Sequence, residues 1–255
     1  MLGAEAGFWY DRPVMNFVKW ENPLVWILRI GIVATLFSTV VVSFDFFFPY
    51  IAPRAFFFQL VTAVLAVVSL AIAVFFPHRR PRGSLLVWAV LAYAAVLAVS
   101  TLSSSNPMKS FVGTVERSFG VFHIFHIIIV FFAALLAFQK PKEWRVFFWI
   151  NVVWSLYPAL DFIMPILMTD AARGNSIMGN QTFLAAYLLL QLFFALHLLI
   201  SGKKHPFFSG ILVLIMSIQV ATILATGVRG AFLGLSTATL FFFFWGMAKS
   251  PKWRV

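Results

Sequence analysis

Eight apolar stretches, separated by short connections, are the feature that most limits how this 255-residue chain can fold. Each stretch has about the 17–25 residues that an α-helix needs to cross the hydrocarbon core of a bilayer. The sequence therefore predicts an all-α integral membrane protein with about eight transmembrane helices. The expected spans are about 24–48, 55–76, 84–102, 120–138, 146–168, 182–200, 207–225 and 231–247.

The composition agrees with a bilayer as the solvent. Hydrophobic residues make up 62% of the chain and charged residues 11%, whereas a soluble domain is about half apolar and a quarter charged. The net charge of +11 does not indicate nucleic acid, because the basic residues mark helix ends instead of one soluble module. The absence of cysteine excludes a disulfide framework, a thiol nucleophile and a cysteine metal site.

The basic residues also predict an orientation. All but five of the 19 Lys and Arg residues lie near the two ends of the chain or in every second connection. Cytoplasmic loops carry this excess of positive charge, so both termini are expected on the cytoplasmic side. No connection is long enough to be a linker between domains, and we expect residues 1–255 to form a single polytopic membrane domain.

Five cations lie in or beside the opposite set of loops, where the topological rule does not place them. They are Arg54, Lys109, Arg117, Arg173 and Arg229. Cations beside membrane helices on this side suggest a binding site for an anionic ligand. The alternative is that their side chains extend to lipid headgroups at the interface.

Arg229 is the most informative of the five, because it lies in a tight Gly-x-Arg-Gly turn between two apolar helices. The planar guanidinium can bind two phosphate oxygens at once. Arg173 precedes Gly174 in another loop of the same side, and Asn180 stands just before a helix whose free amides could face an anion. Two arginines that converge on one diphosphate would form a stronger site than either alone.

Candidate catalytic groups are few. Glu116 lies in the longest outward loop, and His126 follows it within the fourth span, one turn after His123. An ionisable side chain in a membrane helix is a functional candidate, although a hydrogen bond between helices explains either histidine as well. Two histidines without a nearby carboxylate are a weak metal signal, so no metal or other cofactor is expected. Asp45 and Asp161 could pair with cations such as Arg54 or reach interfacial water.

The outward loops, taken in order, resemble the O-antigen ligase family of bacterial membrane glycosyltransferases, which includes O-antigen polymerases. The resemblance spans nearly the whole chain. It rests on Phe48-Pro49-Tyr50-Ile51 with Arg54-Ala55-Phe56, Asn106-Pro107 with Ser110-Phe111, Glu116-Arg117 with Gly120 and His126, Arg173, Gly179 to Leu188, and Thr226 to Leu235.

The resemblance implies a multi-pass protein of the bacterial inner membrane. Such ligases transfer a glycan from undecaprenyl diphosphate to an acceptor, often lipid A-core, on the outer side of that membrane, without a nucleotide sugar or a metal. Arg173 and Arg229 match the arginines that hold the lipid diphosphate, and Asn180, Arg117, Arg54 and Lys109 are further expected binding residues.

Two departures from the family bear on activity. Val228 stands where the family often has Ser or Thr. The family also has about a dozen spans and a large outward loop with a catalytic histidine, whereas this sequence ends after the eighth stretch. We therefore expect a fragment of about two-thirds of such a protein, without its catalytic base. The alternative is a non-catalytic subunit that binds or transports lipid-linked glycans.

Overall fold

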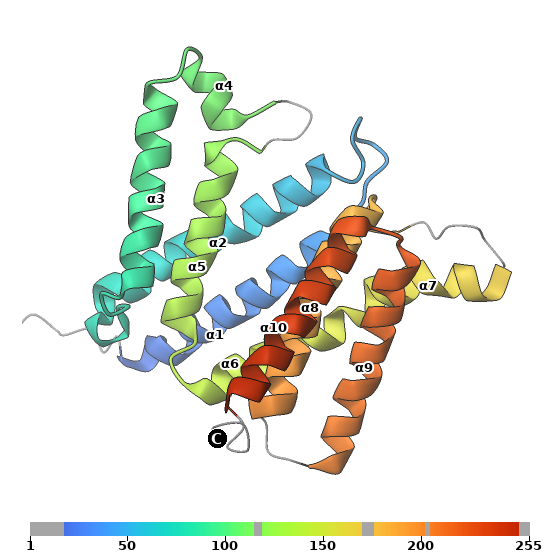
Figure 1. The fold of residues 1–255 in the computed structure, drawn as a ribbon. Helices are drawn as coiled ribbons and strands as arrows, with labels where there is room; N and C mark the ends of the chain where they lie inside the picture. The colour runs from blue at the N-terminus through green and yellow to red at the C-terminus, as the bar shows by residue number, and fades with distance from the viewer. Residues whose placement is uncertain (1–17, 115–118, 170–175, 202–204, 250–255) are drawn as a thin grey trace, which may run out of the picture. The chain divides into compact units, whose positions relative to one another are not determined.

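The computed structural model describes residues 18–114, 119–169, 176–201 and 205–249, and the secondary structure in these ranges is entirely helical (Figure 1). Two short 3₁₀ helices accompany the α-helices, η1 (Phe37–Thr39) and η2 (Pro77–Arg79). The α-helices are α1 (Val18–Leu36), α2 (Ala52–Phe75), α3 (Leu85–Leu102), α4 (Pro107–Val112), α5 (Val121–Ala137), α6 (Pro141–Trp154), α7 (Leu156–Thr169), α8 (Gln181–Ser201), α9 (Pro206–Ala225) and α10 (Arg229–Lys249).

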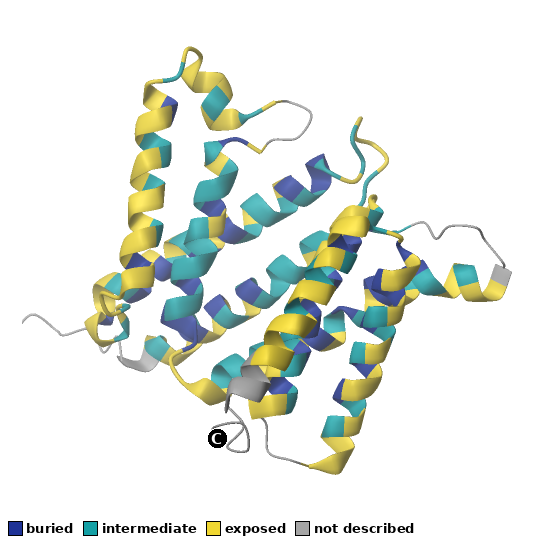
Figure 2. Cartoon of the chain, in the orientation of Figure 1, coloured by how far each residue is buried: buried dark blue, intermediate teal, exposed yellow. Residues whose placement is uncertain are grey.

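Six helical segments are long and apolar enough to cross a membrane, which confirms the all-α, multi-pass architecture in its outline. These segments are Trp20–Thr39, Ala52–Phe75, Leu85–Leu102, Pro141–Met168, Gln181–Ser201 and Pro206–Ala225. The other two expected spans form shorter apolar helices, Val121–Ala137 and Arg229–Phe244. Exposed residues lie along most of the helices (Figure 2). Many of them are large and apolar, as on α3, where Leu85 is 88% exposed. Such surfaces are suited to lipid contact.

The first helical segment ends at Thr39, well before the residue 48 that the apolar pattern predicted. Polar and proline residues explain the early end. The Ser43 hydroxyl donates to Asp45 Oδ2 at 3.0 Å, a local bond that competes with helical pairing. Pro49 disfavours the helical conformation of the residue before it. Residues 40–51 therefore form a connection, and the phenylalanines within it belong to a loop.

The fifth expected span consists of two helices, α6 and α7, which meet at Ser155. Pro158 explains the break, since it has no N–H to donate to the carbonyl of Trp154 and its ring crowds that carbonyl. The two helices together still form one apolar segment of 28 residues. The break lies one turn before Pro158, the first proline of the expected span.

The described residues belong to two compact units, and each is considered on its own. Unit 1 lies within residues 1–35 and 55–139, and unit 2 within residues 36–54 and 140–255. In unit 1, α3 packs against α5, and the short helix α4 contacts both. In unit 2, α8 packs against α9, α6 and α10, and α7 packs against α9.

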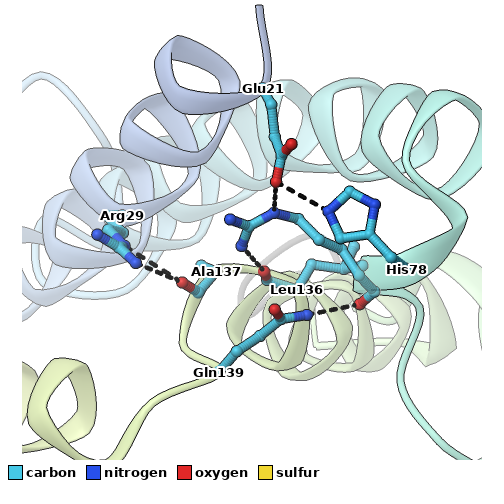
Figure 3. Close-up of polar contacts among 7 residues, drawn as sticks. Glu21, Arg29, His78, Leu136, Ala137 and Gln139 are labelled. Atoms are coloured by element: carbon cyan, nitrogen blue, oxygen red, sulfur yellow. Dashed lines mark hydrogen bonds and ion pairs between the residues drawn. The ribbon is translucent and has the colours of Figure 1, made fainter. Parts of the chain in front are cut away.

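Charged side chains bind together one end of unit 1 (Figure 3). Glu21 of α1 accepts a hydrogen bond from Arg79 Nε at 2.5 Å, and the same oxygen lies 3.0 Å from His78 Nε2. The same guanidinium donates through Nη1 to the carbonyl of Leu136 at 3.4 Å. Gln139 Nε2 in turn donates to the main-chain carbonyl of Arg79 at 3.0 Å. Three segments that are distant in the sequence thus meet around one ion pair.

A second arginine supports the same end of unit 1. Arg29 of α1 donates through Nε and Nη2 to the carbonyl of Ala137, at 3.2 and 3.0 Å. That carbonyl belongs to the last turn of α5, where helical donors are lacking. A cation at a helix C-terminus also stabilises the negative end of the helix dipole.

Two apolar clusters fill the interior of unit 2. We call them the Phe162 cluster and the Ile215 cluster. The Phe162 cluster contains the buried residues Ala159, Phe162, Met178, Leu184, Ala185, Leu188, Ile223 and Ala231. The Ile215 cluster contains Val152, Ala195, Leu198, Leu212 and Ile215.

We predict that Arg79→Gln lowers the free energy of unfolding by about 1.5–3 kcal/mol, the typical loss for a hydrogen bond to a charged group. Arg79 and its carboxylate partner Glu21 are both partly buried, and Glu21 would lose its closest cation. Arg80→Gln is the matched control, because it removes the same charge from an exposed side chain. Thermal unfolding in detergent measures both, and an equal loss of stability in the two variants would contradict the prediction.

Candidate functional site

Arg54, one of the five stray cations, binds main-chain carbonyl groups of two loops in unit 2. It lies in the first turn of α2, and its guanidinium is partly buried. Nε donates to the carbonyl of Val41 at 3.1 Å and Nη1 to that of Met178 at 2.9 Å, while Nη2 donates to the carbonyl of Ile177. Arg54 therefore joins the connection 40–51 to the loop that precedes α8.

Asp161 of α7 holds the same loop from another direction. Its Oδ2 accepts a hydrogen bond from the backbone N–H of Ile177 at 2.8 Å. The carbonyl of Ile177 therefore bonds to Arg54, and the backbone N–H of the same residue bonds to Asp161. Asp161 does not pair with Arg54 directly, and Asp45 accepts from Ser43 within the described part of the chain.

Tyr50 packs on the loop at a glycine. Gly179 has a φ of +76°, and a Cβ atom added there would lie 2.8 Å from Cγ of Tyr50. The Tyr50 ring also lies 5.8 Å from the guanidinium carbon of Arg54, a cation–π contact. Both the backbone conformation and the close approach of Tyr50 therefore require glycine at this position.

Asn180 begins α8 immediately after this loop. Its side-chain Oδ1 accepts from the N–H of Thr182 at 2.8 Å, which is the arrangement of an N-cap. The side chain is exposed. One helix amide is consequently satisfied by the protein itself, and the exposed start of α8 retains the positive end of the helix dipole.

Arg229 differs from Arg54 in its surroundings. It is the first residue of α10, follows Gly227 with a φ of +65°, and is exposed. Its guanidinium makes no hydrogen bond or ion pair with the residues that the structure describes. Arg229 is therefore available to a ligand from outside the protein.

The turn that contains Arg229 and the loop that precedes Asn180 pack against the same apolar cluster, the Phe162 cluster. Met178 of the loop and Ala231 of α10 are both buried in the Phe162 cluster, and Val228 packs against it. Unit 2 thus brings together three of the outward loops predicted from the sequence, which contain Arg54, Asn180 and Arg229. We define these loops, residues 40–54, 176–180 and 226–229, as the candidate site.

Unit 1 contains other candidates from the sequence. Lys109 lies on α4, is exposed, and forms no bond through its ammonium group within the described ranges. His126 is buried, and its Nδ1 bonds to the carbonyl of Phe122 in its own helix at 2.8 Å. His123 lies between the rings of Phe58 and Phe119, and its buried Nδ1 has no partner among the described residues.

Three predicted site residues, Glu116, Arg117 and Arg173, lie outside the described residues. The convergence of Arg173 with Arg229 on one anion therefore stays a prediction. Sequence reasoning identified the loops of the site but did not anticipate the contact of Tyr50 with Gly179. A signal for it existed, since a glycine directly before an N-cap asparagine indicates a special backbone conformation.

No protein-family model, no curated protein and no solved structure matches the chain.

We predict a graded loss of stability in three glycine variants of the site. Gly179→Ala meets both a positive φ and the Tyr50 ring, whereas Gly227→Ala meets only a positive φ, with open space around its Cβ. Gly230→Ala meets neither and gains helix propensity. Melting temperatures in detergent should fall most for the first variant, less for the second and least for the third. A different order would contradict the described loop geometry.

We also predict that Arg54→Lys lowers the free energy of unfolding by at least about 1.5 kcal/mol, because an ammonium group cannot reach three separate carbonyls. Arg229→Lys is the matched control, and as an exposed substitution it should change stability by no more than about 0.5 kcal/mol. Thermal or denaturant unfolding of both variants gives the comparison. Equal stability of the Arg54 variant and the original protein would show that the carbonyl contacts contribute little.

Proposed function

We propose that the protein is an O-antigen-ligase-like membrane glycosyltransferase of the bacterial inner membrane. In this proposal it takes a glycan from undecaprenyl diphosphate and transfers it to a lipid or protein acceptor on the outer side of that membrane. The proposal combines the loop motifs with the chemistry of the candidate site in unit 2. Binding of the lipid-linked glycan and transfer of the glycan depend on different residues.

The observation that carries the binding step is the contrast between two arginines. Arg54 donates hydrogen bonds to main-chain carbonyls and holds the loop before α8 in place. Arg229 is exposed and has no partner in the described part of the chain. Its turn and the loop before α8 both pack against the Phe162 cluster. We assign Arg229 to the diphosphate and Arg54 to positioning the loop that presents Asn180. Arg173 would supply the second guanidinium.

The transfer step needs stabilisation of the departing diphosphate, which gains negative charge as the glycosyl bond breaks. Guanidinium groups held at that position lower the barrier electrostatically. Exposed apolar residues of α10, such as Phe241 and Phe243, offer a surface for the isoprenoid chain. Neither a metal nor a nucleotide sugar has a part in this scheme.

A non-catalytic function is the second candidate, and the surroundings of His126 favour it. This histidine is buried, so an acceptor molecule has little access to it. Glu116 is then the remaining candidate of the two. A protein with the same anion site but no base would bind or transport lipid-linked glycans.

The proposed arrangement in the membrane has eight spans, with both termini in the cytoplasm. It adds the shorter apolar helices Val121–Ala137 and Arg229–Phe244 to the six long segments. The distribution of basic residues supports it, since only five of the 19 would then lie at the outer side.

For binding, we predict that Arg229→Lys weakens the affinity for an undecaprenyl-diphosphate lipid by about 1.5–3 kcal/mol, because the charge remains but the paired donors are lost. Arg82→Lys, an exposed arginine of unit 1, is the control and should bind as the original protein does. Affinity can be measured by microscale thermophoresis in detergent. Unchanged binding by Arg229→Ala would remove this residue from the site.

A transfer assay separates the two candidate functions. The purified protein is mixed with undecaprenyl-diphosphate-linked glycan and an acceptor, and the acceptor is analysed by mass spectrometry. Transfer that is lost in Glu116→Gln would support the enzyme. Tight binding without transfer would support the non-catalytic function.

For topology, reporter fusions after Pro53, Asn106 and Gly227 should all give a signal from the outer side. These positions lie in three connections that carry stray cations. Fusions after Arg80 and Lys249 should report the cytoplasm and serve as controls. A cytoplasmic signal from any of the first three would refute the arrangement.

A further inference from the structure

Three polar side chains interrupt the apolar interior of unit 2 at one level. Ser155 lies between Val152 of the Ile215 cluster and Ala159 of the Phe162 cluster. Gln191 of α8 and Gln219 of α9 likewise lie between residues of the two clusters along their helices. We call Ser155, Gln191 and Gln219 the polar layer; all three are buried, with exposed fractions of 0%, 2% and 0%.

The hydrogen bonds of Ser155 determine how Gln219 is oriented. The Ser155 hydroxyl donates to the carbonyl of Val152 at 2.6 Å, so its single proton is already used. Its oxygen can then only accept, and it accepts from Gln219 Nε2 at 2.8 Å. The side-chain oxygen of Gln219 must therefore point elsewhere, since the amide nitrogen faces Ser155.

Both glutamines retain a buried oxygen that needs a donor. No group in the described part of the chain donates to Oε1 of Gln191 or to Oε1 of Gln219. A buried carbonyl without a hydrogen bond is costly, and native proteins nearly always supply a partner. Two such oxygens at one level of a packed interior indicate a common donor.

The packing of the two helices places both glutamines at one level. Helices α8 and α9 pack together and are joined by a short connection, so they run antiparallel. On α8, Gln191 lies between Leu188 of the Phe162 cluster and Ala195 of the Ile215 cluster. On α9, Gln219 lies between Ile223 of the Phe162 cluster and Ile215, so both side chains stand where the two clusters adjoin.

We propose that the polar layer binds a buried water molecule shared by Oε1 of Gln191 and Oε1 of Gln219. Water carries two protons, which match the two acceptors. The charge of the layer also fits a neutral ligand, because α8 and α9 contain no Asp or Glu, and Asp161 is bonded to Ile177. A polar site of this kind, with two to four partners, is where buried water is found in proteins.

The position of the water gives it a structural role at mid-span. Gln191 lies at the centre of α8, and Ser155 marks the break between α6 and α7. Gln219 also bonds to Ser155, so the water is linked through Gln219 to the residue that separates α6 from α7. This inference does not rest on the proposed glycan chemistry.

The first test is a high-resolution structure of the full chain in detergent or nanodiscs. We expect a density peak at about 2.7–3.2 Å from both glutamine oxygens. A direct contact between the glutamines, or an apolar lipid atom in that place, would overturn the proposal. Melting temperatures should be equal in sodium, potassium and choline chloride, and a specific stabilisation by one metal ion would identify a cation in place of water.

A double-mutant cycle tests whether the water is shared. Gln191→Leu and Gln219→Leu should each lower the melting temperature by several degrees, and the double variant should lose clearly less than the two losses combined. Thr62→Val, a buried substitution in unit 1, is the control and should combine additively with Gln191→Leu. Additive losses in the glutamine pair would contradict a shared water. If a leucine variant does not fold, Gln→Met variants replace it.

Discussion

The need to satisfy main-chain carbonyl groups where apolar helices end is the constraint on which much of this structure depends. Water is scarce near membrane helices, so an unbonded carbonyl there is expensive. Arginine side chains supply donors to such carbonyls at three places. Arg29 and Arg79 bond to carbonyls in the last turn of α5, and Arg54 bonds to carbonyls of two loops. The five donors of a guanidinium are spread over a planar fork, so it can bond to carbonyls that lie further apart than a compact ammonium group can reach.

The helices could be predicted well, because length and apolarity decide them with little help from tertiary contacts. Their ends were harder to predict. The run of apolar residues continues to Phe48, yet the helix stops at Thr39, where a Ser43–Asp45 bond and Pro49 favour a loop. Apolar composition therefore shows where lipid can be contacted, whereas local hydrogen bonding and proline determine where the helix ends.

The site was predictable only in part, for a physical reason. A cation beside a membrane helix has the same appearance in the sequence whether it binds a carbonyl or an external anion. Arg54 and Arg229 both stood against the topological rule, but the structure gives Arg54 three carbonyl partners and leaves Arg229 exposed. The glutamines of the polar layer were visible as polar residues in apolar helices, yet only the packing reveals that they share one level.

The different roles proposed for the two arginines explain how unit 2 could bind an anion without losing its fold. An arginine that moved toward a ligand could not also hold the loop, since its donors would be lost to the carbonyls of Ile177 and Met178. Because Arg54 and Asp161 hold that loop, the proposed binding of a diphosphate by Arg229 would leave the Phe162 cluster packed. Affinity and stability should therefore depend on different residues of the same site, and substitutions that change one should leave the other nearly unchanged.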